Sequence, residues 1–310
     1  MKASGMAAPA DMIIRNGTVI DGTGARDRFV GDVAIRGGKI VAVGAAAKAM
    51  TAEQEYDATG MLVTPGWVDC HTHYDAQIGW DPTMSPSCWH GVTSVVFGNC
   101  GVTFAPCWPD DHDFLVELME GVEDIPGTAL HDGISWQWTS FPEFLDFLET
   151  LPACMDFAPQ IGHAAVRSFV IGERSVDPAA EPTDVELQAM ADVVQEAVEA
   201  GAAGFSSTFA EIHMDVHGNN VPGCFATERE VLAMAKAANR AGYAVYETAG
   251  GVGNNVGMRH MLDIAKEVVV TFTCIEAGMA KTVEWLEKVN TAETRIIGQV
   301  FARCITRNSN

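Results

Sequence analysis

Hydrophobic and polar positions follow two different periods along this chain. In the first part, short runs that alternate or are rich in β-branched residues predict strands at Met12–Val19, Asp32–Arg36 and Lys39–Val43. The Gly37-Gly38 pair between the last two runs is typical of a tight hairpin turn. We therefore predict a small β-domain, a β-sandwich segment, over residues 1–63.

From residue 64 onward, apolar runs typical of buried strands alternate with stretches of helical period, which predicts a parallel sheet. The expected strands are Gly66–Cys70, Ser94–Gly98, Phe157–Ile161, Gly204–Ser207, Tyr243–Thr248, Val268–Thr273 and Ile296–Phe301. The expected helices are Asp113–Val122, Phe141–Leu151, Asp184–Ala200, Glu228–Ala241, Met258–Glu267 and Lys281–Val289.

Two of these helices carry the sequence signals of helix ends. Thr183 with Glu186, and Thr227 with Glu230, have the spacing of a capping box. A glycine directly follows each helix, which is typical of a helix C-terminus.

The alternation predicts an α/β fold, a TIM-like (β/α) barrel over residues 64–310 whose active site lies at the C-terminal ends of its strands. A closed barrel of this type has eight strands, and the pattern provides about seven. The segment Arg303–Asn310 is short and polar and does not read as the eighth strand. We therefore expect an incomplete barrel, either a fragment of a longer fold or a natural truncation.

Composition narrows the function classes. Hydrophobic residues make up 48% of the chain, and 41 acidic against 19 basic residues give a net charge of −22, which argues against nucleic-acid and anionic-membrane partners. The N-terminus has no signal-peptide pattern, and no apolar run approaches the length of a membrane span. Eight cysteines in a chain of this length do not predict a disulfide scaffold, so we expect a cytoplasmic protein with reduced thiols.

The segment Pro65–Asp75 carries the clearest chemical signal. An apolar run leads directly into His71-Thr72-His73, and residues i and i+2 of a strand point to the same side. Two neutral imidazoles presented together at a strand end suit a divalent transition metal. The alternative is a pair of surface or structural histidines, for which we would expect an ordinary loop instead of a buried strand before them.

Cys100 is the second candidate. It follows the apolar run of the second predicted barrel strand and stands between Gly98 and Gly101. As a thiolate beside His71 and His73 it would be a strong zinc ligand. A small buried hydrophobic side chain is the equally weighted alternative.

Other polar residues remain open between a functional and a structural role. His163 ends the third predicted strand, where it would either line the pocket or pack as a hydrogen-bonded histidine. His213 and His217 lie in a polar loop and would face either substrate or solvent. Asp75 would support a ligand from behind or cap a helix.

The motifs around these residues resemble the amidohydrolase superfamily and, within it, the D-aminoacylase (N-acyl-D-amino-acid deacylase) family. The more specific match is His90–Gly101, and Val63–His73 resembles the family's metal motif. Further family-like stretches are Ile13–Gly24, Glu117–Gly127 and Gly201–Ser207.

This resemblance implies one or two zinc ions held in part by His71, His73 and Cys100, with the cysteine in the place where other amidohydrolases have a carboxylated lysine. It also implies hydrolysis of a small N-acyl-D-amino acid by metal-activated water, with a carboxylate that carries the proton to the leaving amine.

The chain departs from the family pattern at three places. The family histidines at the ends of the fifth and sixth strands are replaced by Ala249 and Cys274. Glu247 or Cys274 is chemically able to substitute for them. The catalytic aspartate of the eighth strand belongs beyond Asn310, so no catalytic residue is assigned.

Three hypotheses follow. The first is a metal-dependent amide hydrolase that deacylates N-acyl-D-amino acids, and the second is a cyclic-amide hydrolase of the same superfamily. The third is a catalytically incompetent truncated barrel that binds metal or partners without turnover. Its open strand edge would favour self-association.

Overall fold

The structure, a computed structural model, describes residues 9–250, 255–274 and 279–300. The chain divides into two compact units, Met1–Trp67 and Val68–Asn310. Each has its own cluster of buried apolar side chains. The sequence boundary was expected after residue 63, and the naming of the two parts as a β-domain and a hydrolase barrel stays a prediction.

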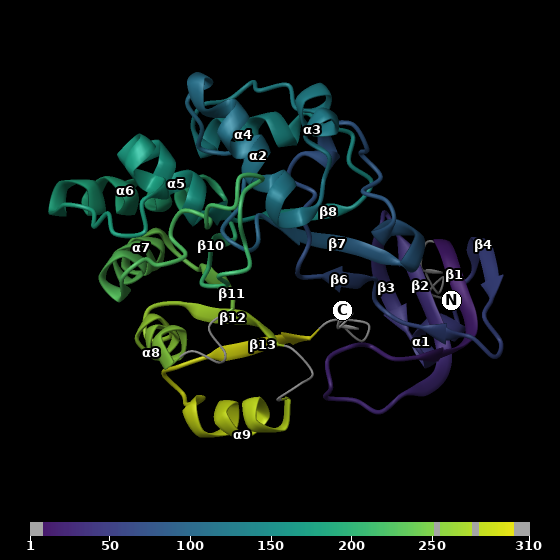
Figure 1. Ribbon diagram of the computed structural model, residues 1–310. Coiled ribbons are helices and arrows are strands. Elements are labelled where there is room, and N and C mark those ends of the chain that lie inside the picture. Colours follow the sequence, from purple (N-terminus) through teal and green to yellow (C-terminus); the bar gives the residue numbers. More distant parts are fainter. Residues whose placement is uncertain (1–8, 251–254, 275–278, 301–310) are drawn as a thin grey trace, which may run out of the picture. The chain divides into compact units, whose positions relative to one another are not determined.

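The first unit contains a five-stranded mixed sheet (Figure 1). Its elements are β1 (Ala10–Val19), β2 (Phe29–Arg36), β3 (Lys39–Val43), α1 (Ala45–Lys48), β4 (Ala52–Asp57) and β5 (Leu62–Val63). β2 pairs antiparallel with both β1 and β3, whereas β4 and β5 run parallel to β1. Gly37 and Gly38 have φ values of 57° and 71°, which confirms the predicted hairpin turn. This is the one sheet that the described residues of the unit form, so the β-sandwich stays a prediction.

The second unit contains two sheets. The strands are β6 (Trp67–Asp69), β7 (Val92–Phe97), β8 (Asp156–Pro159), β9 (Ile161–Gly162), β10 (Gly204–Thr208), β11 (Val245–Ala249), β12 (Val269–Cys274) and β13 (Ile296–Val300). One sheet has the order β6-β7-β8, and the other has the order β13-β12-β11-β10-β9 with parallel pairing throughout. The predicted third strand is split, because β8 pairs with β7 and β9 pairs with β10. A single closed barrel is therefore not seen within the described residues.

Helices follow most of these strands, as the alternating pattern predicts (Figure 1). They are α2 (His112–Glu123), α3 (Gly127–Gly133), α4 (Phe141–Glu149), α5 (His163–Ile171), α6 (Asp184–Ala200), α7 (Glu228–Ala241), α8 (Asn255–Ile264) and α9 (Met279–Val289). Short 3₁₀ turns lie at Gln77–Gly79, Ser87–His90, Pro109–Asp111 and Gly172–Val176. Helix α5 was missed because its first six residues are all buried, which removes the apolar–polar period that marks a surface helix.

One predicted helix cap is confirmed and the other is wrong. The Thr183 side chain accepts a hydrogen bond from the Glu186 N–H at 3.3 Å, and Glu186 accepts one from the Thr183 N–H at 2.7 Å. No side-chain cap forms at Thr227. Glu230, its expected partner, is instead 1% exposed and accepts hydrogen bonds from Arg167 and His163. The Glu230 carboxylate takes part in a buried ion-pair network and therefore does not complete the capping box at Thr227.

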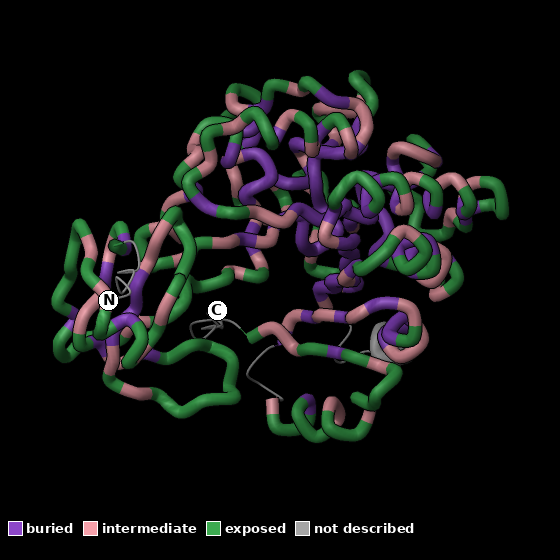
Figure 2. Tube along the Cα trace, turned by 180° about the vertical axis from the view of Figure 1, so that it is seen from behind, coloured by how far each residue is buried: buried purple, intermediate pink, exposed green. Residues whose placement is uncertain are grey.

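The five-stranded sheet of the second unit is deeply buried at β10 and β11, near the candidate site. All five residues of β10 and four of the five in β11 are buried (Figure 2). Ser206 pairs in register with Glu247, and Glu247 with Thr271, so these three polar side chains share one face of the sheet. Polar residues in the middle of buried strands are unusual, which makes this face a candidate for chemistry.

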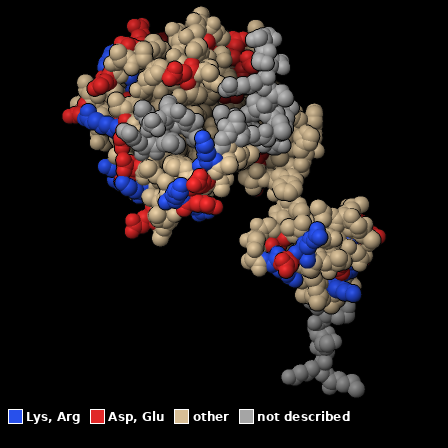
Figure 3. Space-filling model, turned by 60° about the horizontal axis from the view of Figure 1, so that its bottom comes forward, with Lys and Arg blue, Asp and Glu red and all other residues tan. Residues whose placement is uncertain are grey.

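The surface adds little to this picture. Acidic and basic side chains are interspersed on the face drawn in Figure 3, which agrees with charge spread over many elements. None of the helices that the structure describes combines the length and the apolar character that a membrane crossing requires.

Gly98, in the turn that follows β7, gives a prediction about fold stability. Its φ is 79°, and a Cβ there would lie 2.1 Å from the Gln160 carbonyl oxygen. We expect Gly98→Ala to lower the free energy of unfolding by more than the roughly 1–2 kcal/mol of left-handed backbone strain alone. Gly218→Ala is the control, because Gly218 has a φ of 86° with open space around its Cβ position. Equal urea midpoints for the two variants would contradict this account.

Glu230 gives a stability prediction with a defined pH dependence. Burial opposes its ionisation, but hydrogen bonds and charges from His163 and Arg167 outweigh burial and lower its pKa from 4.5 to about 2. Its contribution should therefore be present above about pH 4.5 and be lost as the pH falls toward 2.

We expect Glu230→Gln to destabilise the fold by roughly 3–5 kcal/mol near neutral pH, because it leaves Arg167 buried without its carboxylate. The difference from the natural chain should shrink in urea titrations at successively lower pH. Glu196→Gln, at an exposed position of α6, is the control. A deficit that does not change with pH would be evidence against the ion-pair network.

Candidate metal centre

His71 and His73 lie directly after β6, as the sequence predicts. Their rings approach each other with centroids 5.5 Å apart in an edge-on arrangement. Thr72, between them, donates to the Val96 carbonyl from its N–H at 3.0 Å and from its hydroxyl at 2.7 Å. Because Thr72 is anchored to β7 in this way, the two histidines turn to a common side.

Cys100 meets the histidines from the turn after β7. The backbone of this turn is left-handed, with φ values of 79° at Gly98, 57° at Cys100 and 75° at Gly101. A non-glycine residue in this region is uncommon and is held there by its surroundings. The Cys100 N–H donates to Glu247 Oε2 at 2.8 Å, and Ser206 Oγ accepts from the Gly101 N–H at 2.9 Å.

Nitrogen and sulfur atoms of the three predicted ligands converge. His71 Nε2 lies 3.2 Å from Cys100 Sγ, and one donor atom each from His71, His73 and Cys100 lie within 4.8 Å of one another. Two imidazoles and a thiol form the donor set of a zinc-type site with an open position. Their role as metal ligands stays a prediction.

The ring nitrogens that point away from the three-donor group, Nδ1 of His71 and Nε2 of His73, contact other polar side chains. His71 Nδ1 lies 2.8 Å from Gln299 Oε1 and 3.6 Å from Glu247 Oε1, while His73 Nε2 lies 3.1 Å from Glu123 Oε1. An amide or carboxylate behind an imidazole fixes its tautomer and orientation, and is typical of metal-binding histidines. His73 Nδ1 is buried without a hydrogen-bond partner, which leaves this nitrogen for a ligand.

Buried acids surround these donors. Burial raises the pKa of Glu247 to about 8, of Glu123 to about 8 and of Asp75 to about 7, and the charges of neighbouring carboxylates add to the effect at Glu247 and Glu123. Burial also raises the pKa of the Cys100 thiol, and all three carboxylates add to that increase. A bound cation would reverse this balance, because it stabilises thiolate and carboxylates together.

The imidazoles are in the form that a metal requires. Burial lowers the pKa of His71, and it lowers that of His73 to about 3 with help from the charges of His71 and His213. Neutral rings with free lone pairs, a thiol beside them and uncompensated acids around them fit a divalent metal.

The structure also gives the positions of His163, His217 and Asp75, for which the sequence leaves a functional and a structural role open. His163 is buried and packed, with Nε2 2.8 Å from Glu230. His217 is exposed and lies 3.2 Å from Glu117. Asp75 accepts from the Gly98 N–H at 3.2 Å, so it supports the turn that presents Cys100 and caps no helix there.

Of the two residues considered as substitutes for the family histidines, only Glu247 faces the centre. A Cβ built on Gly298 would lie 2.5 Å from Cys274 Sγ, 3.7 Å from Phe272 of β12 and 3.7 Å from Leu286 of α9. Cys274 therefore lies on the helix-covered face of β12, opposite to Thr271. Glu123 and Gln299 were missed by sequence reasoning because each is far from the His-x-His motif in the chain.

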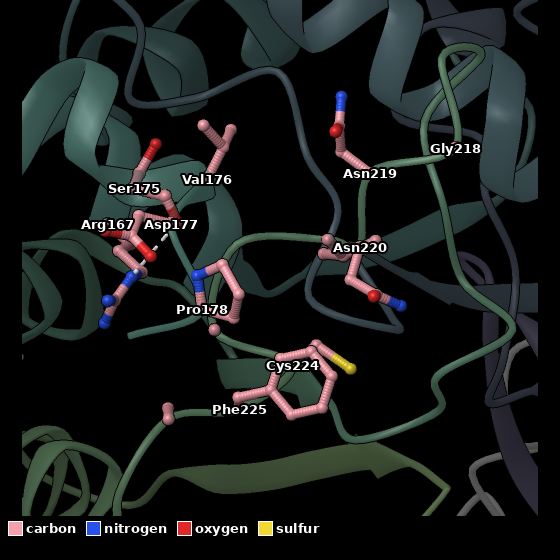
Figure 4. Close-up of a pocket in the computed structure, with 13 residues that line it drawn as sticks. Arg167, Ser175, Val176, Asp177, Pro178, Gly218, Asn219, Asn220, Cys224 and Phe225 are labelled. Atoms are coloured by element: carbon pink, nitrogen blue, oxygen red, sulfur yellow. Dashed lines mark hydrogen bonds between the residues drawn. The ribbon is translucent and has the colours of Figure 1, made fainter. Parts of the chain in front are cut away.

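A separate cavity of about 200 Å³ lies beside Arg167 (Figure 4). Asn219 and Asn220 approach it from one side and Ser175 from another (Figure 4). His71, His73 and Cys100 do not line this cavity. Arg167 Nη1 donates a hydrogen bond to Glu230 Oε2 at 2.6 Å. The cavity is thus distinct from the candidate metal centre.

Comparison with known proteins shows which family the chain belongs to. The sequence model of the amidohydrolase family matches residues 54–299. The chain belongs to the amidohydrolase family. Within this family it is similar to the D-aminoacylase of Alcaligenes xylosoxydans xylosoxydans, with 34% identity over 199 residues that cover 64% of this chain and 38% of that protein.

Two other amidohydrolase relatives extend the comparison. The N-acyl-D-glutamate deacylase of the same organism is 32% identical over 234 residues, covering 75% of this chain and 42% of that protein. The crystal structure of N-acyl-D-glutamate deacylase from Bordetella bronchiseptica, complexed with zinc and a phosphonate inhibitor, matches 96% of this chain and 59% of its own at 26% identity and a TM-score of 0.75. The resemblance to D-aminoacylases is confirmed. The chain spans about 38–42% of the length of these curated relatives.

The contacts behind the two histidines predict that metal affinity depends on residues outside the donor set. We expect Gln299→Leu and Glu123→Ala each to weaken Zn²⁺ binding by roughly 10- to 100-fold, because His71 or His73 loses its orienting partner. Competition with a chromophoric chelator measures this. Gln188→Leu, on the exposed side of α6, is the control. Unchanged affinity in both site variants would show that the rings need no support.

Proposed function

We propose that this chain carries the metal centre of a zinc-dependent amide hydrolase that removes the acyl group from N-acyl-D-amino acids. The convergence of His71, His73 and Cys100 in an acid-lined site is the observation that carries the proposal. The similarity to D-aminoacylase and to N-acyl-D-glutamate deacylase supports the substrate class and the D configuration.

The donor set accounts for one ion. His71 Nε2, His73 Nδ1 and Cys100 Sγ would hold it, and three protein ligands leave a position open, as catalytic zinc sites do. Zinc in such a site supplies Lewis acidity, which activates water and polarises a carbonyl group. The similarity to a zinc-containing deacylase structure supports this choice of metal.

The chain's own residues prepare the site for this chemistry. The Gln299 amide oxygen accepts from His71 Nδ1, so that Nε2 keeps its lone pair toward Cys100. Burial of the acids excludes water from the side of the centre that faces the sheet. An enclosed, low-dielectric site of this kind strengthens each electrostatic contact with a substrate.

A second function is favoured by a different observation. Ala249 offers no donor at the end of β11, and Cys274 faces the helices, so two positions that the family fills with histidine contribute nothing to the centre. A protein that binds metal without turnover would have this property. Activity of the whole chain therefore decides between the two proposals.

The test uses the full chain, stripped with a chelator and titrated with Zn²⁺. We expect binding of about one ion, and loss of affinity in His71→Ala and Cys100→Ser beyond the roughly 100-fold that a supporting contact contributes. Cys107→Ser is the matched control, because Cys107 is also buried but lies outside the donor group.

Amine release from N-acetyl-D- and N-acetyl-L-amino acids is then measured with and without zinc. Zinc-dependent release from the D substrates supports the hydrolase. Zinc binding without any amine release would favour the non-catalytic function, and a Cys100→Ser variant that binds zinc like the natural chain would contradict the centre itself.

A further inference from the structure

A buried amide joins the two chain segments that carry the candidate ligands. Asn99 directly precedes Cys100 and is 0% exposed. Its side-chain Nδ2 donates to the Thr72 carbonyl oxygen at 3.1 Å and to the Val96 carbonyl oxygen at 3.1 Å. Because Thr72 is the central residue of the His-x-His motif, one side chain connects that motif with the turn that presents the thiol.

This connection forms where the pairing of β6 with β7 has ended. The His-x-His motif and the cysteine turn both lie beyond the last residues of these strands. The Val96 carbonyl oxygen accepts from the Thr72 N–H at 3.0 Å, from the Thr72 hydroxyl at 2.7 Å and from the Asn99 amide. The Asn99 amide therefore takes the place of a backbone pair and holds the two segments together past the strand ends.

The partners of the amide fix its orientation. Both groups that face Nδ2 are backbone carbonyl oxygens, which only accept hydrogen bonds, so the nitrogen of the amide must lie on their side. On the other side, Asn99 Oδ1 accepts from Gln160 Nε2 at 3.1 Å, and Gln160 is 3% exposed. Each polar atom of the Asn99 side chain thus has a partner in a dry environment, where such bonds are strong and specify one arrangement.

Asp75 and Asn99 connect the histidine segment and the cysteine turn from opposite sides. Asp75 accepts from the Gly98 N–H at 3.2 Å, whereas Asn99 donates to the Thr72 carbonyl oxygen. The bond of Asn99 ends between the two imidazoles, and Asn99 is itself the neighbour of Cys100 in the chain. A displacement of this amide would therefore move the sulfur relative to both rings.

We propose that Asn99 is a positioning residue of the metal centre, whose amide fixes the distance from the Cys100 sulfur to the two imidazoles before a metal binds. This inference rests on the proposed function, because it concerns the same donor set. The three donor atoms lie within 4.8 Å of one another. A site that is already assembled does not have to order its ligands during binding, so the amide contributes to metal affinity.

The experiment removes the two N–H donors and keeps the shape of the side chain. In Asn99→Asp, an oxygen replaces Nδ2 opposite two carbonyl oxygens, and their former bonds are lost. We expect Zn²⁺ affinity to fall by roughly 10- to 100-fold, the range for a contact that supports a ligand. With Co²⁺ as the probe, the thiolate-to-cobalt charge-transfer absorption at saturation should weaken, because the sulfur is displaced while the imidazoles still bind the ion.

Ser207→Ala is the matched control. Ser207 is also 0% exposed and contacts the Tyr246 hydroxyl, so this change removes a buried polar contact away from the donors. It should lower the free energy of unfolding and leave the Zn²⁺ affinity and the Co²⁺ spectrum unchanged. If both variants lose affinity in proportion to their loss of stability, Asn99 acts through stability alone and the proposal is wrong.

An Asn99→Asp variant with the zinc affinity and the cobalt spectrum of the natural chain would overturn the proposal. Asn99→Ala, which places no oxygen opposite the two carbonyl groups, gives the same test with the same expected loss of affinity if Asn99→Asp does not fold.

The metal-free chain separates this inference from the proposed function. Iodoacetamide should modify Cys100 slowly in the natural chain, where Cys100 is 5% exposed, and faster in Asn99→Asp but not in Ser207→Ala. Peptide mapping by mass spectrometry measures these rates. Equal rates in the three proteins would contradict the role of Asn99 alone, whereas a natural chain that binds no zinc would contradict the proposed function.

Discussion

The hydrogen bond from the Cys100 N–H to the buried Glu247 carboxyl connects the two sheets of the Val68–Asn310 unit at the point where the candidate ligands meet. Its donor belongs to a left-handed turn after β7, and its acceptor is a fully buried carboxyl group on β11. Asp75 and Ser206 hold the same turn at Gly98 and Gly101. The position of the Cys100 sulfur relative to His71 therefore depends on contacts from both sheets.

This arrangement concentrates acidity in a region with little compensation among the described residues. Glu247 and Glu123 pair with histidines and not with lysine or arginine, and the pKa of each acid and of the Cys100 thiol is raised. Buried acidic groups are expensive for a fold unless they are neutralised or paired. A divalent cation at the proposed centre would neutralise these groups.

Elsewhere in the same unit the fold balances buried charge internally. Glu230 lies between His163 and Arg167, and its pKa is lowered instead of raised. The contrast between Glu230 and Glu247 is informative because both are buried to a similar degree. Burial alone does not mark a candidate functional acid, whereas burial without a strong cationic partner does.

The chain alone determined the local features of this protein. The period of apolar residues predicts most strands and helices, and the His-x-His motif and the glycines around Cys100 predict three side chains at strand ends, because these signals act over a few neighbouring residues. Only the tertiary structure decided what lies behind them. Gln299 and Glu123 reach His71 and His73 from distant elements, Cys274 turns toward the helices, and β8 and β9 part into different sheets at Gln160. These outcomes depend on which surfaces pack together, a property that no local pattern of residues contains.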